Sequence, residues 1–249
     1  MIKWNTKRLM VAANALAAAL VILLTGSAAG AQSLSVLPVN IFFPAGQKAA
    51  TLTITNQGKS ETAVQIRAFG WNQQDGNDQQ LTGTDAVLMS PPLATIAPGA
   101  SQVVRLILRQ APADREATYR ILVDQIPPPA EPGIVHIVLR LSIPIFAMPE
   151  GRAFPHLRFH MENNGDKVFL VGVNDGLVHE LIRDIVLTTS DGRQFKEEAS
   201  TSPYILAGAT RRWPIAAQGS LLLPSETLRL TAHSNAGAID EQVHFASAQ

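Results

Sequence analysis

The 249-residue sequence contains no cysteine. This absence excludes a disulfide framework, a zinc site built on thiolates and a cysteine nucleophile. The patterns GxSxG, GxGxxG and HExxH and the phosphate-binding loop are missing as well, and nothing local supports a scattered Ser-His-Asp triad. The sequence therefore predicts a protein that is not an enzyme and that uses neither a cofactor nor ATP.

Long hydrophobic runs are scarce. One run, at residues 9–24, follows a basic start at residues 1–8 and precedes the small residues Ala29 and Ala31. This order is typical of a secretory signal with an Ala-x-Ala cleavage site. An uncleaved membrane anchor is the alternative, but the run is shorter than the ~20 residues that cross a bilayer. We expect cleavage after Ala31 and a mature chain of residues 32–249.

An excess of positive charge is also lacking. The whole chain has 20 basic and 20 acidic residues, and loss of Lys3, Lys7 and Arg8 with the signal leaves 17 basic residues and a formal charge of −3. This balance offers no electrostatic attraction for nucleic acid, so no nucleic-acid partner is predicted.

The mature chain shows the alternation of apolar and polar residues that is typical of β-strands, with turn residues between the strands. We predict strands at residues 51–55, 63–71, 102–108, 118–126 and 134–146, and again at 154–161, 167–174, 182–189, 203–206, 211–215, 220–223, 227–232 and 242–246. A short helical turn is predicted at 111–117. Strands that recur every ten to fifteen residues favour an all-β protein made of two antiparallel sandwiches. The predicted divisions are a signal at 1–31 and domains at 32–148 and 149–249.

One predicted strand is unusually long. Residues 134–146 read IVHIVLRLSIPIF, with an apolar residue at every odd position from Val135 to Ile145. A typical strand has only ~5–6 residues, and a long apolar strand is an aggregation hazard when its edge is exposed. The side chains of this row either fill the core of their own domain or pack into the core of a second domain.

Three arginines lie between apolar neighbours: Arg67, Arg105 and Arg140. Each one either extends its charged end to solvent or forms an internal ion pair, for example with Glu116 or Asp124. The other interpretation is that one of them binds the carboxylate of a ligand.

The histidines do not predict a metal site. His156 and His160 are four residues apart, which on a strand places them on one side but ~13 Å from each other. That separation is too large for one zinc ion with bonds of ~2 Å. We predict that both are surface residues, and that His136 points to solvent from the long strand.

Several segments, in order, resemble the PapD-like periplasmic chaperones that assemble pili. They are PPLATIAPGASQVVRL at 91–106, YRILVDQIPP at 119–128, and the 134–146 stretch followed by Pro149. In the second half, YILAG at 204–208 followed by Arg-Trp resembles a pattern of the archaic branch, which serves spore-coat-U-like pilins. The resemblance implies two immunoglobulin-like sandwiches arranged as an L, and a location in the periplasm.

The resemblance also implies a mechanism, donor-strand complementation. A pilin subunit is an immunoglobulin-like domain that lacks one strand, and the chaperone inserts its own long edge strand into the open groove. The implied donor side chains are Val135, Ile137, Leu139 and Leu141. An outer-membrane usher that receives the complex is the second implied partner. A secreted adhesive or structural module remains the alternative function, with a β-sandwich hydrolase as a third.

The sequence departs from the better-known branch at its carboxylate anchor. That branch uses two basic residues to bind the terminal carboxylate of the subunit, and the corresponding positions here are Asn40 and Pro144. The remaining candidates are Arg105, Arg67 and Arg140, and Arg105 is preferred because the family motif includes it.

The charge cluster inside the family fold is also incomplete in this sequence. Glu116 is present, but Met148 stands where the resemblance implies an arginine.

Overall fold

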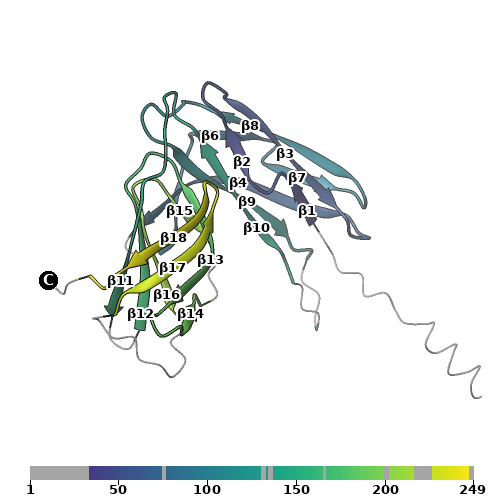
Figure 1. Cartoon of the computed structure of the whole chain (residues 1–249). Helices are drawn as coiled ribbons and strands as arrows, with labels where there is room; N and C mark the ends of the chain where they lie inside the picture. Colours follow the sequence, from purple (N-terminus) through teal and green to yellow (C-terminus); the bar gives the residue numbers. More distant parts are fainter. Residues whose placement is uncertain are drawn as a thin grey trace, which may run out of the picture.

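The computed structural model describes residues 34–74, 77–129, 133, 137–164, 167–198, 202–215 and 226–246. Across these ranges the chain forms strands and no helix, and hence no helix that is long and apolar enough to cross a membrane. The strands build two β-sandwiches whose long axes meet at an angle, which gives the molecule an L shape (Figure 1). The predicted all-β fold with two sandwiches is confirmed.

Strands β1 to β10 form the first sandwich. Their bounds are β1 (Leu34–Leu37), β2 (Ile41–Phe43), β3 (Ala49–Asn56), β4 (Thr62–Gln74), β5 (Asn77–Gly83), β6 (Val87–Ser90), β7 (Leu93–Ile96), β8 (Ser101–Leu108), β9 (Ala117–Ile126) and β10 (Arg140–Ala147). One sheet has the order β1-β3-β8-β6, and the other has the order β2-β10-β9-β4-β5, with β7 paired to β4. Alternate residues point inward, so Val104, Leu106 and Leu108 of β8 are buried in the core between the sheets.

Strands β11 to β18 form the second sandwich. Their bounds are β11 (Leu157–Asn164), β12 (Lys167–Asn174), β13 (Glu180–Thr188), β14 (Gln194–Lys196), β15 (Tyr204–Ile205), β16 (Thr210–Ile215), β17 (Leu228–Ser234) and β18 (Gly237–Val243). One sheet has the order β11-β12-β16, and the other has the order β14-β13-β17-β18, with β15 paired to β13. Trp213 lies fully buried in the core between them.

The structure corrects two local expectations. The helical turn expected at 111–117 is wrong: β9 already begins at Ala117, and the N–H of Glu116 donates to the carbonyl of Leu177 in the second domain instead of to a helical turn. The strand expected at 134–146 is shorter than predicted, because β10 begins only at Arg140. Arg140 pairs with Asp124 of the neighbouring strand β9, and β9 ends only two residues after Asp124. Little of β9 is therefore left to pair with the residues that precede Arg140.

Some expectations concern residues that the structure leaves undescribed. These are the signal at 1–31, residues 134–136 with Val135 and His136, and the strand expected at 220–223. The division expected at 148/149 falls in the segment between β10 and β11. Those domain boundaries stay a prediction.

Candidate functional site

The β10 strand has a free edge. It pairs with β9 along its whole length, from Arg140 to Ala147, but with β2 only from Ile145 to Ala147. Among the described residues, no strand pairs with the other side of β10 from Arg140 to Pro144. Pro144 fits this edge, because proline has no backbone N–H and an edge strand has no neighbouring strand there to accept a hydrogen bond. This edge presents backbone groups that another chain can pair with.

The apolar row passes from exposed to buried along this edge. Ile137 is 85% exposed, Leu139 and Leu141 are partly buried, and Ile143 and Ile145 are buried. Leu141 already packs against the core of the first domain. The backbone of Leu139 still follows β9, since Gln125 N–H donates to its carbonyl over 2.9 Å. Thus the backbone is supported by β9 at Leu139, and the first domain leaves the Ile137 side chain uncovered.

Two of the three candidate arginines share one carboxylate. Arg67 Nη2 lies 2.7 Å from Asp124 Oδ2, and Arg140 Nε donates to the other oxygen of Asp124. Burial alone raises the pKa of Asp124, but hydrogen bonds and charge from Arg140 and Arg67 outweigh it, so the pKa is lowered. The internal ion pair is therefore confirmed for Arg67 and Arg140.

The third candidate lies elsewhere. Arg105 is on β8, in the other sheet of the first sandwich, and its exposed side chain points outward between Val103 and Ile107. The structure brings Arg67 and Arg140 together and leaves Arg105 apart from them.

A fourth arginine, Arg120, lies in the angle between the domains. It is on β9, directly across from Pro144 of β10, and is only 7% exposed. Its guanidinium carbon lies 3.8 Å from the centre of the Trp71 ring, and its buried Nε has no hydrogen-bond partner. Burial lowers the pKa of Arg120, and the nearby Tyr204 partly offsets this effect. Among the described residues no carboxylate pairs with this cation.

Of the two positions at which the resemblance implies a basic anchor, Pro144 lies directly across from Arg120 and Asn40 lies on the other side of Pro144. The β2–β10 register, with Ile41 opposite Ile145, continues to Asn40 opposite Pro144. Asn40 Oδ1 accepts a hydrogen bond of 3.2 Å from the hydroxyl of Tyr204 in the second domain. Sequence reasoning missed Arg120 because the two positions expected to carry the basic anchor hold uncharged residues. Only the strand register shows that β9, the strand next to Pro144, supplies an arginine there.

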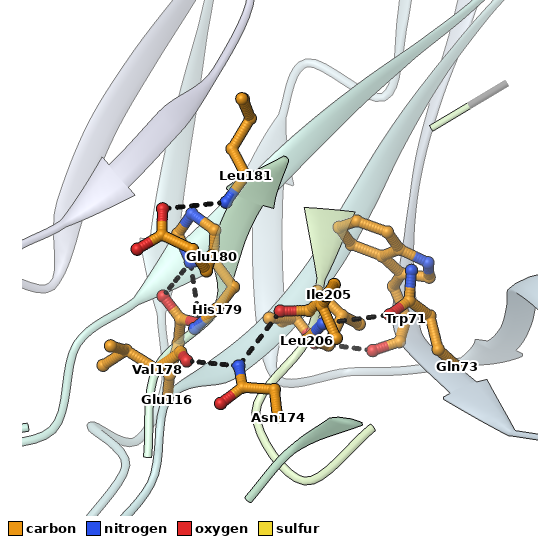
Figure 2. Close-up of polar contacts among 11 residues, drawn as sticks. Trp71, Gln73, Glu116, Asn174, Val178, His179, Glu180, Leu181, Ile205 and Leu206 are labelled. Atoms are coloured by element: carbon orange, nitrogen blue, oxygen red, sulfur yellow. Dashed lines mark hydrogen bonds and ion pairs between the residues drawn. The ribbon is translucent and has the colours of Figure 1, made fainter. Parts of the chain in front are cut away.

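The domain junction contains a buried link between Glu116 and His179 (Figure 2). His179 Nδ1 lies 2.8 Å from Glu116 Oε1, and the backbone N–H of His179 donates to Oε2 over 2.8 Å. The imidazole also stacks on Phe146, with 3.6 Å between ring centres. Met148 lies across from Glu116 when the β9–β10 register is continued, so a histidine of the second domain takes the place of the missing arginine.

Further contacts between the domains surround this link. Trp71 and Phe146 of the first domain form a buried cluster with three residues of the second, Tyr204, Leu206 and Ala209. The side chain of Gln73 donates to the carbonyl of Tyr204 and accepts from the N–H of Leu206, each over 2.9 Å. The hydrogen bonds of Gln73, seen in Figure 2 beside Trp71, join the two sandwiches.

We expect His179→Ala to loosen this junction. The substitution removes the stacking on Phe146 and leaves the buried Glu116 carboxylate with fewer partners, at a cost of about 1–3 kcal/mol. Chemical unfolding measures the stability, and small-angle scattering measures the domain angle. His156→Ala is the matched control, because that side chain is exposed and should change stability by less than about 0.5 kcal/mol. Equal effects of the two substitutions would contradict the proposed importance of the link.

The two histidines considered as metal ligands pair with acidic neighbours. His156 contacts Asp175, and His160 Nε2 lies 3.0 Å from Glu162. Within the described ranges, no three His, Asp or Glu side chains gather in a way that could hold a metal ion.

Comparison with known proteins identifies relatives for this arrangement. The family model "Pili and flagellar-assembly chaperone, PapD N-terminal domain" matches residues 33–153. FimB/FhaD, a chaperone protein of Bordetella pertussis, is 29% identical over 163 residues, which are 61% of this chain and 63% of the relative. PapD of Escherichia coli is 30% identical over 112 residues, which are 43% of this chain and 45% of PapD. The chain thus spans less than two thirds of the length of these curated relatives.

Solved structures share the fold over a larger part of the chain. A chaperone–tip subunit complex, CsuC–CsuE from the archaic chaperone-usher Csu pili of Acinetobacter baumannii, superposes with a TM-score of 0.66 and 22% identity, covering 86% of this chain and 100% of that chain. The YadV chaperone superposes with a TM-score of 0.60 and 18% identity, covering 84% and 98%. At such identities the likeness shows the fold. Residues 33–153 of the chain thus belong to the PapD N-terminal domain family of pili and flagellar-assembly chaperones.

Proposed function

We propose that this protein is a periplasmic chaperone that binds pilin-like subunits by donating the edge of β10 and the residues before it. The observation that carries the proposal is the free edge from Arg140 to Pro144, preceded by the exposed Ile137. A protein that left such an edge uncovered without a use for it would risk aggregation. Addition of a strand to an open sheet is a known mode of recognition, and chaperone–pilin complexes are one example of it.

The proposed donor row is Val135, Ile137, Leu139 and Leu141. Burial of an exposed side chain of this size contributes about 1.5–3 kcal/mol. Ile137 and Leu139 have the most to gain among the described members, because Leu141 already contacts its own core. Backbone hydrogen bonds supply affinity that does not depend on the client sequence, and the apolar row selects an open groove of matching depth.

We propose Arg120 as the carboxylate anchor, in preference to Arg105, Arg67 and Arg140. Arg67 and Arg140 already share Asp124, and Arg105 lies on the other sheet. Arg120 is a buried cation beside the end of the free edge, and a carboxylate in that position would offset the cost of burying its charge. The partner that fits is a subunit whose last strand ends at the angle between the domains.

The proposed location is the periplasm, and the proposed second partner is the outer-membrane usher that receives the chaperone–subunit complex. CsuC in the complex with CsuE is a chaperone bound to a tip subunit before assembly, and this chain has the same fold. The proposed mechanism needs no nucleotide, since binding supplies the strand that the subunit lacks and release at the usher exchanges that strand for one of another subunit.

The test is co-expression with a pilin-like protein encoded beside this gene, both exported to the periplasm. We expect the pilin to accumulate as a soluble complex only in the presence of this chain, because its open groove would otherwise aggregate. The measurement is the amount of soluble pilin that co-purifies with the chain. Equal accumulation of pilin without the chain would instead favour an adhesive or structural role.

A further inference from the structure

A cavity is present at the domain junction, away from the β10 edge. A pocket of about 350 Å³ lies between the domains. The first domain and the link contribute the apolar residues Phe42, Pro44, Met148 and Pro155, and the second domain contributes Val178, His179, Glu180 and Asn235. Ligand pockets of proteins commonly have volumes of ~300–1,000 Å³, lie between domains, and combine apolar walls with a few polar groups.

The polar group of greatest interest in this pocket is the Glu180 carboxylate. Glu180 is only 3% exposed. One oxygen, Oε1, accepts hydrogen bonds from the N–H groups of Leu181 (3.0 Å) and Asn235 (2.9 Å). Among the described residues, nothing donates to the other oxygen, Oε2, and no cation forms an ion pair with either. The residues that line the pocket include neither lysine nor arginine.

The neighbouring groups do not neutralise this carboxylate. The residue that precedes Glu180 is His179, which also lines the pocket, and its Nδ1 contacts Glu116. Glu116 and Glu180 are thus two buried carboxylates at the domain junction, and the His179 imidazole contacts the first of them. A buried carboxylate gains from a cation that reaches it, because the low dielectric strengthens their attraction.

The walls favour a flat apolar body for that cation. Phe42 is half exposed and stacks on Phe146 and His179, with ring centres 5.5 and 6.4 Å away. Proline, valine and methionine complete the wall, and methionine adapts well to an aromatic guest.

We propose that this pocket binds a small organic cation with an aromatic or branched apolar body and one ammonium group. The apolar body lies against Phe42, Met148 and Val178, and the ammonium group donates to the Glu180 carboxylate. Since both domains line the pocket, the ligand stabilises the angle between them. The site is independent of the proposed chaperone activity, because it uses neither the β10 edge nor Arg120.

The test uses three probes of one shape: 2-phenylethylammonium, the neutral 2-phenylethanol and the anionic 3-phenylpropanoate. The full mature chain is titrated and amide chemical shifts are followed by NMR. We expect the cation to bind with a dissociation constant on the order of 1 mM and to shift the Leu181 and Asn235 amides. The neutral probe should bind about 10-fold more weakly, and the anion should bind least.

Two substitutions separate the parts of the proposal. Glu180→Gln keeps an acceptor for Leu181 and Asn235 and removes only the charge, so the cation should lose about 10-fold in affinity while 2-phenylethanol changes by less than about twofold. Met148→Trp fills the pocket and should abolish binding of all three probes. Leu93→Trp, at an exposed site of the first domain, is the control and should change nothing. The proposal is overturned if the anion binds as well as the cation, if Glu180→Gln leaves the preference intact, or if the shifts map to other residues.

Discussion

Ile137→Asp and Leu139→Asp are each expected to abolish capture of a pilin subunit. Either substitution removes one apolar side chain worth about 1.5–3 kcal/mol in the groove and places a carboxylate there without a partner. Together these effects should weaken binding by roughly 100-fold or more. Ile137 is 85% exposed in the free chain, so its substitution should leave the unfolding midpoint unchanged. The measurement is the yield of complex from co-expression, followed by the affinity for the purified subunit.

Ile107→Asp is the matched control for these substitutions. Ile107 is an exposed isoleucine of the same domain, but it lies on β8 in the opposite sheet. It should leave complex formation with the subunit unchanged. A normal yield of complex from the folded Ile137→Asp and Leu139→Asp proteins would refute the donor assignment. If Ile107→Asp lowered the yield of complex equally, the loss would be due to changed solubility and not to the donor row.

Arg120→Ala is expected to weaken subunit binding by about 2–5 kcal/mol, which is roughly 30-fold or more. The reason is that the substitution removes the cation proposed to bind the terminal carboxylate of the subunit, and leaves that carboxylate unpaired. Arg105→Ala, on the other sheet, should have no such effect on subunit binding. Calorimetry with a purified subunit measures both affinities. Because Arg120 lies against Trp71, the unfolding midpoint of each variant is measured as well.

A change in the subunit completes the test of Arg120. If the terminal carboxylate is the group that Arg120 binds, then amidation of that terminus should weaken binding to the unaltered chaperone and have little further effect on Arg120→Ala. Two independent, additive losses would mean that the arginine and the carboxylate do not contact each other. If Arg105→Ala lowered the affinity for the subunit more than Arg120→Ala did, Arg105 would be the carboxylate anchor.

Local pattern was sufficient for much of the fold. Alternation along residues 102–108 and 167–174 predicted β8 and β12 closely, because each strand has one face on a core and one outside it. The same reasoning failed at 111–117, where the segment is held by a hydrogen bond from Glu116 to Leu177, far away in the sequence. No local pattern contains that information.

The sequence by itself determined that this is an all-β protein of two sandwiches, and that an apolar row runs into β10, because strand period and turn residues are local properties. Only the tertiary structure decided which members of that row remain uncovered, since this depends on where β2 and β9 end. It also decided that Arg120 lies beside Pro144 and that His179 partners Glu116. Those residues meet through strand register and domain packing, which bring together positions that are distant along the chain.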